Sequence, residues 1–171
     1  YEDGTFAFIE MNTRIQVEHT VTEQVTGIDI VREQLRAALG ERLSLAQQDV
    51  RTEGHAIECR INAEQGFEGR PSPGRLTHWH APGGPGIRVD SHMQAGAEVP
   101  PHYDSLIAKI IASGRDRAEC MARMKAALAE LRVEGVATNA ALHLFVLDQP
   151  AFEDGGVSIH FLERKLQQDR A

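Results

Sequence analysis

A row of polar residues near the start of the chain has the types and the spacing to do chemistry. Residues 10–18 read Glu-Met-Asn-Thr-Arg-Ile-Gln-Val-Glu. Polar side chains of long reach fill the even positions of this row, which are Glu10, Asn12, Arg14, Gln16 and Glu18. Alternate residues of an extended chain point to the same side, about 7 Å apart, so the row predicts one polar face. By pattern alone, a half-exposed strand with a solvated face explains the alternation equally well.

The residue types in this row favour a reaction. Glu10 and Asn12 offer hard oxygen ligands that suit Mg²⁺ or Mn²⁺ beside phosphates. The guanidinium of Arg14 is a planar fork for an oxyanion such as bicarbonate or phosphate. Glu18 can serve as a general base. A metal site, an oxyanion clamp and a base in one row predict phosphoryl transfer to a small acid.

The flanking elements are expected to hold this row in place. Residues 6–11 are apolar and β-prone and predict a buried strand directly before it. Residues 27–40 predict a helix that stops at Gly40. Polar residues from 44 to 54 predict a connection, so we expect one unit over 1–48 and a second over 49–171. The apolar face of the expected helix consists of Ile30, Val31, Leu35, Ala38 and Leu39.

The second unit is expected to be rich in β-structure and then helical. Residues 55–62 alternate, with Ile57, Cys59 and Ile61 on one face. Further strands are expected at 75–81, 87–92 and 106–112, separated by Gly- and Pro-rich turns. A helix over 116–131 presents a core-facing stripe. Thr138 and Asn139 can cap a further short helix that runs to about 147 and is stopped by Pro150, and a last helix spans 159–168. The stripe consists of Met121, Met124, Leu128 and Leu131.

Composition excludes several classes of function. The net charge is -7 and the basic residues are scattered, so no nucleic-acid role is expected. No apolar run approaches the ~18 residues of a membrane span. Cys59 and Cys120 lie far apart without a C-x-x-C motif, which favours buried, reduced thiols and a cytoplasmic setting. His78 and His80 share a strand face, but they lack a third ligand nearby and are expected to be exposed histidines.

The row now shows a resemblance to a known family. Residues 10–19 resemble the signature of the biotin carboxylases, members of the ATP-grasp group. Further segments resemble the same family in the same order, at 58–64, 71–74, 80–84, 100–101, 103–105, 123–125, 138–139, 155–156 and 159–160. The resemblance covers nearly the whole chain. It implies an α+β fold, in which 1–48 end an ATP-grasp domain and 49–171 form the mainly antiparallel β-sheet and helices of the biotin carboxylase C-terminal domain.

The resemblance also implies a reaction and a set of roles. Enzymes of this family use ATP to activate bicarbonate as carboxyphosphate, and then carboxylate the ureido nitrogen of biotin on a carrier protein. Taken alone, Arg60 is an exposed strand residue paired with Glu58 or Glu64. By resemblance, Glu10 and Asn12 bind the metals with ATP; Arg14, Gln16 and Val17 hold bicarbonate; Glu18 deprotonates it; Arg60 stabilises the enolate-like oxygen of biotin; Asp104 lies near biotin; and Ile159 and His160 wall the adenine pocket.

The implied partners are a biotin carboxyl carrier protein or domain, a carboxyltransferase component and a second copy of the enzyme. Arg88 resembles a residue at the family's dimer contact, but Pro85 stands where some relatives have a large side chain, which weakens the homodimer expectation. Thr20 also departs from the family, since a proline is usual there. Acetyl-CoA carboxylase of fatty acid biosynthesis, the propionyl-CoA, methylcrotonyl-CoA and pyruvate carboxylases and urea amidolyase all carry this component, so the final acceptor stays open.

We expect this chain to be a piece of a longer protein and inactive by itself. It opens on Tyr1 and reaches a predicted strand at once, and it shows no glycine-rich phosphate lid. Two other interpretations remain. One is a non-catalytic module for dimerisation or carrier docking, in which Glu18 and Arg60 do not matter. The other is a different ATP-grasp ligase, such as a carbamoyl-phosphate synthetase-like enzyme, whose family lacks the run from Gln16 to His19.

Overall fold

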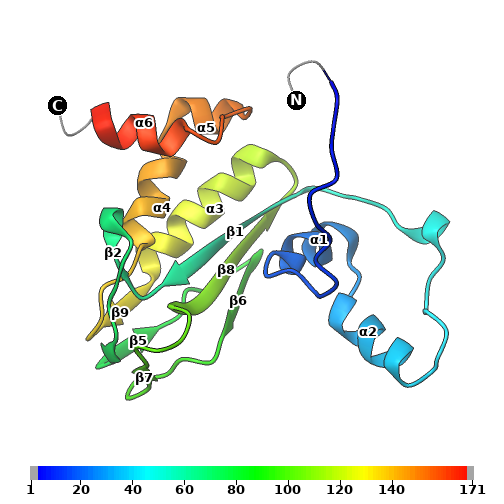
Figure 1. Ribbon diagram of the computed structural model, residues 1–171, viewed down its shortest axis with the longest axis horizontal. Coiled ribbons are helices and arrows are strands. Elements are labelled where there is room, and N and C mark those ends of the chain that lie inside the picture. The colour runs from blue at the N-terminus through cyan, green and yellow to red at the C-terminus, as the bar shows by residue number, and fades with distance from the viewer. Residues whose placement is uncertain (1–3, 169–171) are drawn as a thin grey trace.

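The computed structural model of the protein describes residues 4–168 and centres on a three-stranded antiparallel sheet (Figure 1). Strand β8 (Leu106–Gly114) is central, with β1 (His55–Asn62) and β6 (Ile87–Ser91) on either side. Helix α3 (Arg117–Glu130) packs against β8 and β1, and helix α1 (His19–Thr26) packs against the same two strands. The predicted α+β class with antiparallel strands is therefore confirmed.

The apolar core lies between this sheet and α3. The predicted stripe of α3 is buried, and the predicted apolar face of β1 packs against it, which confirms both expectations. Asp116 caps the helix by accepting a hydrogen bond from the backbone of Glu119 at 2.8 Å. Burial of these aliphatic side chains stabilises the sheet by about 25 cal/mol per Å² of apolar surface. The largest fully buried apolar side chains are Ile61, Leu76, Ile107, Ile110, Ile111 and Met124.

Three separate two-stranded sheets accompany the three-stranded sheet, and two of them correct a predicted strand. The pairs are β2 (Glu64–Gln65) with β3 (Arg70–Pro71), β4 (Gly74–Arg75) with β7 (Glu98–Val99), and β5 (His78–His80) with β9 (Arg132–Glu134). The expected continuous strand over 75–81 is wrong because the chain changes partner in its middle. The backbone N–H of Leu76 donates to Ala97, whereas that of Thr77 donates to Glu134, each at 2.9 Å.

The first part of the chain departs most from expectation. Residues 6–11 form no strand, and Phe6 and Ile9 are 95% and 90% exposed. A strand needs a neighbour for its backbone groups, and no described segment pairs with this one. Residues 10–18 are likewise not a strand, since a bend at Arg14 and a turn at Val17 and Glu18 lead into α1. The expected single polar face is therefore wrong as a strand geometry.

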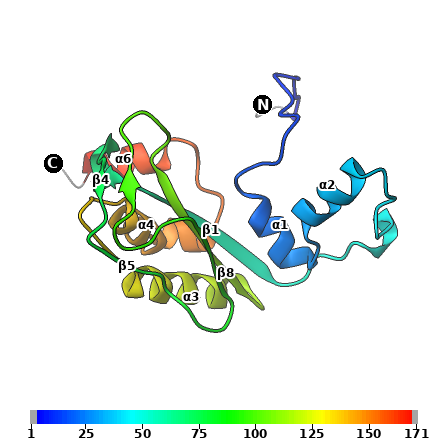
Figure 2. The same cartoon turned by 90° about the horizontal axis from the view of Figure 1, so that it is seen from below.

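The helix predicted over 27–40 is the shorter helix α2, and a separate helix, α1, ends just before that range. Gly27 has a positive φ of 70° and ends α1, so it is a stop and not a start. Helix α2 (Ile30–Ala38) begins after Asp29, whose carboxylate accepts from the backbone of Arg32 at 2.8 Å. None of the residues of α2 is buried, so its predicted apolar face lies at the surface. In both views α1 and α2 lie on the side of the sheet away from α5 and α6 (Figure 2).

The C-terminal helices follow the prediction with one correction. Helix α4 (Ala140–Leu147) starts after Asn139, and α6 (Phe161–Gln168) matches the expected last helix. Pro150 does not stop α4 but begins α5 (Pro150–Asp154), where its fixed φ suits a first helical turn. Short 3₁₀ turns lie at η1 (Gln47–Asp49) and η2 (Gly66–Glu68). Among residues 4–168 no helix has the length and apolar character to cross a membrane.

Candidate functional site

The sheet face opposite α3 carries polar side chains in register. Arg60 of β1 lies opposite Lys109 of β8, and Lys109 lies opposite Asp90 of β6. Their neighbours along β1, Cys59 and Ile61, belong to the apolar core on the α3 side. Because side chains alternate along a strand, Arg60, Lys109 and Asp90 share the other face, the one that α1 covers.

Glu18 and Arg60 meet at the start of α1. The Nη2 atom of Arg60 lies 2.8 Å from Oε2 of Glu18, although the two residues are 42 positions apart. The side chains are 49% and 56% exposed, so the pair is open to solvent and to small molecules. An ion pair of this exposure contributes about 0–1 kcal/mol, and a substrate can therefore compete with it.

A second carboxylate supports Arg60 from its own strand. Oε1 of Glu58 lies 3.8 Å from Nε of Arg60, and the side chain of Glu58 is 4% exposed. The other oxygen of Glu58 accepts a hydrogen bond from the hydroxyl of Thr20, which is fully buried on α1. Glu64, the other expected partner of Arg60, instead accepts from Asn62 at 3.0 Å and from Ser105. The sequence-based pairing of Arg60 was thus right for Glu58 and wrong for Glu64.

Lys109 ties the turn before α1 to the sheet. Its Nζ donates to the carbonyl oxygen of Val17 at 3.0 Å and lies 3.3 Å from Nε2 of His19. The same ammonium lies 3.8 Å from Asp90. Lys109 therefore fixes the backbone of Val17 beside Glu18, at the position where the resemblance implies a bicarbonate contact.

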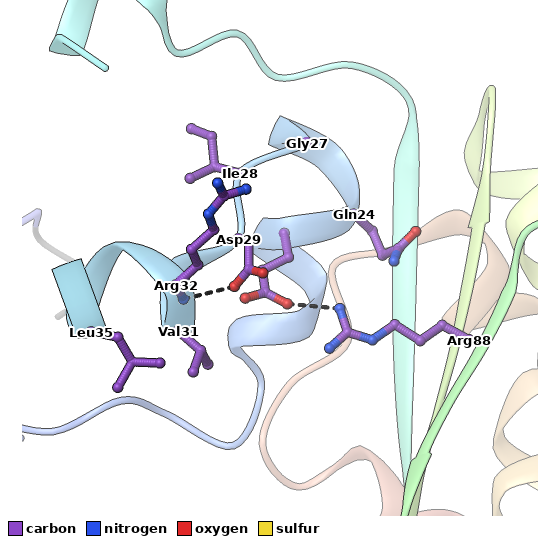
Figure 3. Close-up of a pocket in the computed structure, with 9 residues that line it drawn as sticks. Gln24, Gly27, Ile28, Asp29, Val31, Arg32, Leu35 and Arg88 are labelled. Carbon is purple, nitrogen blue, oxygen red and sulfur yellow. Dashed lines mark hydrogen bonds and ion pairs between the residues drawn. The ribbon is translucent and has the colours of Figure 1, made fainter. Parts of the chain in front are cut away.

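Arg88 joins α1 to β6 through two carboxylates. Its guanidinium binds Asp90 in a fork at 2.7 and 2.8 Å, and a third nitrogen lies 2.7 Å from Glu23 (Figure 3). Burial raises the pKa of Glu23, but hydrogen bonds from Arg88 and from the backbone of Ile30 outweigh burial and hold the pKa below its ordinary value. The hydrogen bond from Arg88 also lowers the pKa of Asp90. Arg88, expected at a dimer contact, is thus engaged within its own chain.

A pocket of about 740 Å³ opens between Arg88 and the first two helices (Figure 3). It lies beside the Glu23–Arg88 pair and extends to Asp29, the capping residue of α2. The side chains of Ile28, Val31 and Leu35 form the apolar part of its wall. The pocket does not include Glu18 or Arg60.

The structure brings some of the expected site residues together and leaves others apart. Val17, Glu18 and Arg60 meet at the turn before α1, where Arg14 bonds only the carbonyl oxygen of Ile15, at 3.1 Å. Gln16 is half-buried in the same turn. No hydrogen bond or ion pair among the described residues joins the remaining expected residues to this group. These are Glu10 and Asn12 in the N-terminal coil, Asp104 before β8, and Ile159 and His160 before α6.

The details of the outlying residues agree with exposed positions. Asp104 accepts a hydrogen bond from the backbone of Leu106 at 2.8 Å, which is the turn role considered for it. Ile159 is 94% exposed, and His160 lies 3.8 Å from Glu163. Neither residue walls a closed pocket within the described chain.

Glu10 and Asn12 fit the expected role in metal binding by their chemistry. Both are exposed, and neither forms a hydrogen bond or ion pair with another described residue, so their oxygens are available. Carboxylate and amide oxygens are the donors that Mg²⁺ accepts beside a nucleotide. Within residues 4–168 no group of three or more His, Cys, Asp or Glu forms a metal site. The two side chains therefore offer oxygen donors but do not form a complete ligand set by themselves.

The cysteines and the paired histidines follow the simpler expectations. Cys59 and Cys120 are free and buried. Burial raises the pKa of Cys59 to about 12, so its thiol stays protonated and is a core residue rather than a nucleophile. His78 and His80 are exposed, and His80 lies 3.1 Å from Glu130.

Sequence reasoning missed most residues that support Arg60. Lys109 is the one charged residue in the run from Leu106 to Ala112, and a charge in such a strand signals a partner. The sequence predicts no role for Thr20. It predicts Asn139 only as a helix cap, and nothing in it singles out His143. Both contact the backbone of β1, which no sequence pattern indicates.

The fold and this group of residues indicate an enzyme component of the ATP-grasp type, and comparison with known protein families points to the same class. The family described as biotin carboxylase C-terminal domain matches residues 58–164, and the family described as carbamoyl-phosphate synthase L chain, ATP binding domain, matches residues 1–46. The chain belongs to the biotin carboxylase C-terminal domain family, which confirms the resemblance drawn from its motifs.

Individual relatives agree with this assignment. A biotin carboxylase of Pseudomonas aeruginosa is 58% identical over 170 residues, which cover 99% of this chain and 38% of that protein. A pyruvate carboxylase component from Methanothermobacter thermautotrophicus is 49% identical over 95% of this chain and 33% of its own length. The chain thus spans well under half the length of the curated relatives it matches.

Solved structures show the same fold. The biotin carboxylase domain of Hydrogenobacter thermophilus 2-oxoglutarate carboxylase, described as a dimer with MgADP, ADP and bicarbonate, superposes with a TM-score of 0.92. It is 46% identical, and the match covers 97% of this chain and 37% of that one. A Campylobacter jejuni biotin carboxylase in complex with β-γ-ATP gives a TM-score of 0.89 at 40% identity, over 95% of this chain and 36% of the other.

Proposed function

We propose that this chain forms the bicarbonate- and biotin-facing part of a biotin carboxylase, which uses ATP to carboxylate biotin on a carrier protein. The observation that carries the proposal is the contact between Glu18 and Arg60, a base and a permanent cation 2.8 Å apart on an open surface. Family membership and relatives that bind ADP, magnesium and bicarbonate support it.

The chemistry follows from the two side chains. Glu18 is exposed and acts as the base that takes the proton of bicarbonate. Arg14, Gln16 and the backbone of Val17, in the adjoining turn, hold the anion. ATP with Mg²⁺ or Mn²⁺, held in part by Glu10 and Asn12, supplies the phosphoryl group that activates bicarbonate as carboxyphosphate.

Arg60 acts on the acceptor. Its guanidinium has five N–H donors, and one of them is used by Glu18. N–H groups that Glu18 leaves free bind the ureido oxygen of biotin as negative charge develops on that oxygen during carboxylation. Fixed donors aimed at a developing charge are among the largest contributions to catalysis. Asp104 lies near biotin, and Ile159 and His160 contact the adenine of ATP in the complete enzyme.

The complete enzyme works with partners. We place residues 1–48 at the end of an ATP-grasp domain and residues 49–171 in the C-terminal domain. A biotin carboxyl carrier protein brings the biotin, a carboxyltransferase component consumes carboxybiotin, and two copies form a dimer. Two buried free thiols suit the cytoplasm. The 171-residue chain alone neither hydrolyses ATP nor carboxylates biotin.

The test is bicarbonate-dependent ADP release by the complete enzyme that contains this sequence, with and without free biotin. Biotin is expected to raise the wild-type rate of ADP release. Arg60→Ala is expected to lower the biotin-dependent part of this rate by about 10²–10³-fold, which is the effect of deleting a transition-state donor. Arg115→Ala, which removes an exposed arginine paired with Glu119, is the matched control and keeps the rise. If ADP release ignores biotin in the wild type, another ATP-grasp ligase is the better assignment.

A further inference from the structure

Side chains, not another strand, close the outer edge of β1. In the three-stranded sheet β1 pairs with β8 alone, so its other edge presents backbone groups that need partners. The side chain of Asn139 meets this edge: its Oδ1 accepts from the backbone N–H of Asn62 at 2.9 Å, and its Nδ2 donates to the carbonyl oxygen of Arg60 at 3.1 Å. A carboxamide has the donor and the acceptor of a peptide unit, so Asn139 replaces the missing strand.

The contact is buried and reinforced by the main chain. Asn139 is 8% exposed, and its own N–H donates to the carbonyl oxygen of Asn62 at 3.2 Å. As the residue before α4 it occupies the cap position, yet its side chain makes no capping hydrogen bond. An asparagine side chain at this position normally satisfies the first turn of its helix. Here it is used on β1 instead.

His143 adds a second donor from the first turn of α4. Its Nε2 lies 2.8 Å from the same carbonyl oxygen of Arg60. A carbonyl oxygen only accepts, so Nε2 carries the proton in this contact. The carbonyl oxygen of Arg60 thus receives two hydrogen bonds from α4, one from Asn139 and one from His143.

These contacts hold β1 where its pairing with β8 is irregular. The register shifts between Ile61 and Asn62, where β8 contributes one extra residue, Ile107, against β1. Such an irregularity interrupts the ladder and changes the local twist, and bulges are frequent beside active sites. The contacts from Asn139 lie on both sides of the shift, at Arg60 and at Asn62. They therefore fix the backbone direction from which the Arg60 side chain leaves the sheet.

We propose that Asn139 and His143 are positioning residues for Arg60, which aim its guanidinium at Glu18 and at biotin through the backbone of β1. This inference rests on the proposed function. Neither residue touches a reacting atom. Their effect belongs to the biotin-dependent step because they act through Arg60, the residue proposed to bind biotin. A displacement of about 1 Å at a catalytic group lowers a rate by up to about 10²-fold.

The test uses the complete enzyme with four variants. His143→Leu removes the donor and keeps the bulk of a half-buried position, whereas His143→Gln restores an N–H donor. Asn139→Asp keeps the acceptor for Asn62 but faces the carbonyl oxygen of Arg60 with a carboxylate. His78→Gln, at an exposed histidine of β5, is the matched control. The readouts are kcat for biotin-dependent ADP release, KM for ATP and the thermal midpoint.

The expected result is a fall in biotin-dependent kcat of about 10–100-fold for His143→Leu and Asn139→Asp, with KM for ATP unchanged. His143→Gln and His78→Gln are expected within about twofold of wild type. If Asn139→Asp does not fold, the pair His143→Leu and His143→Gln decides the matter. Equal kcat values for His143→Leu and His143→Gln overturn this inference and leave the proposed function standing. A change of both kcat and KM for ATP in the variants has the same meaning. A wild type indifferent to biotin overturns the proposed function and the inference together.

Discussion

At the scale of single residues, Thr20 is the support of a buried charge. The side chain of Glu58 is 4% exposed, and its nearest cation, Nε of Arg60, lies 3.8 Å away. The hydroxyl of Thr20 supplies the direct hydrogen bond to this carboxylate. A buried carboxylate without such a donor is costly, so the hydroxyl of Thr20 has a structural consequence.

We therefore expect Thr20→Val to lower the free energy of unfolding of the chain by about 1–3 kcal/mol, since it leaves a buried acceptor unsatisfied at nearly constant volume. Urea denaturation at neutral pH measures the change. Thr22→Val, at an exposed position of the same helix, is the matched control and is expected within about 0.5 kcal/mol of wild type. Equal destabilisation by the two variants would show that the Thr20 hydroxyl is not needed.

The single residues that we propose to act in the reaction were easier to predict than the residues that support them. Glu18 and Arg60 belong to segments with a strong family pattern, and the structure places them 2.8 Å apart. Thr20, Asn139 and His143 act through contacts to buried or backbone atoms. Such contacts depend on which strand edge a helix start reaches, and neither periodicity nor residue type specifies that.

At the scale of elements, a helix or strand was predicted correctly where its own residue pattern indicated it, and was missed where packing against other elements decided its structure. Strand β1 was predicted with its observed bounds because one face is apolar and packs on the core. Helix α1 was missed, since the run from His19 to Thr26 contains several β-branched residues that favour strands. Burial of Thr20 and Glu23 against the sheet overrides that preference.

Helix α4 makes stability depend on pH through His143. Burial lowers the pKa of His143 below its ordinary value of 6.5, against the opposing effect of its hydrogen bond to Arg60. The unfolded chain therefore binds a proton at higher pH than the folded chain does. The stabilisation from the neutral imidazole is present above pH 6.5 and is lost as the pH falls toward the lower pKa of the folded state.

We expect the free energy of unfolding of the chain to fall as the pH drops below 6.5, the ordinary pKa of histidine, and His143→Gln to reduce this slope because glutamine does not titrate. Denaturant titrations at several pH values measure it. His78→Gln, at an exposed position of β5, is the matched control and should keep the wild-type slope. A slope that is unchanged by His143→Gln would contradict the buried, neutral state of this histidine.

At the scale of the whole molecule, apolar side chains are buried in the sheet and α3 but exposed on α2. The sheet and α3 enclose a continuous aliphatic core, whereas α2 leaves Val31, Leu35 and Leu39 exposed by 42%, 62% and 79%. These residues recur every four positions and form one stripe along the helix. The sequence predicted the stripe correctly, but its burial depends on surface that the described residues do not provide.

Contiguous apolar surface of this kind favours association. We expect the 171-residue chain to self-associate at micromolar concentration and to bind a hydrophobic dye, because about 25 cal/mol is gained for each Å² of apolar surface that is buried. Leu35→Glu places a charge on the stripe and should shift sedimentation toward the monomer and reduce dye fluorescence. Ala37→Glu adds the same charge on another side of α2 and should leave both unchanged. If both variants act alike, net charge explains association, and the stripe on α2 does not.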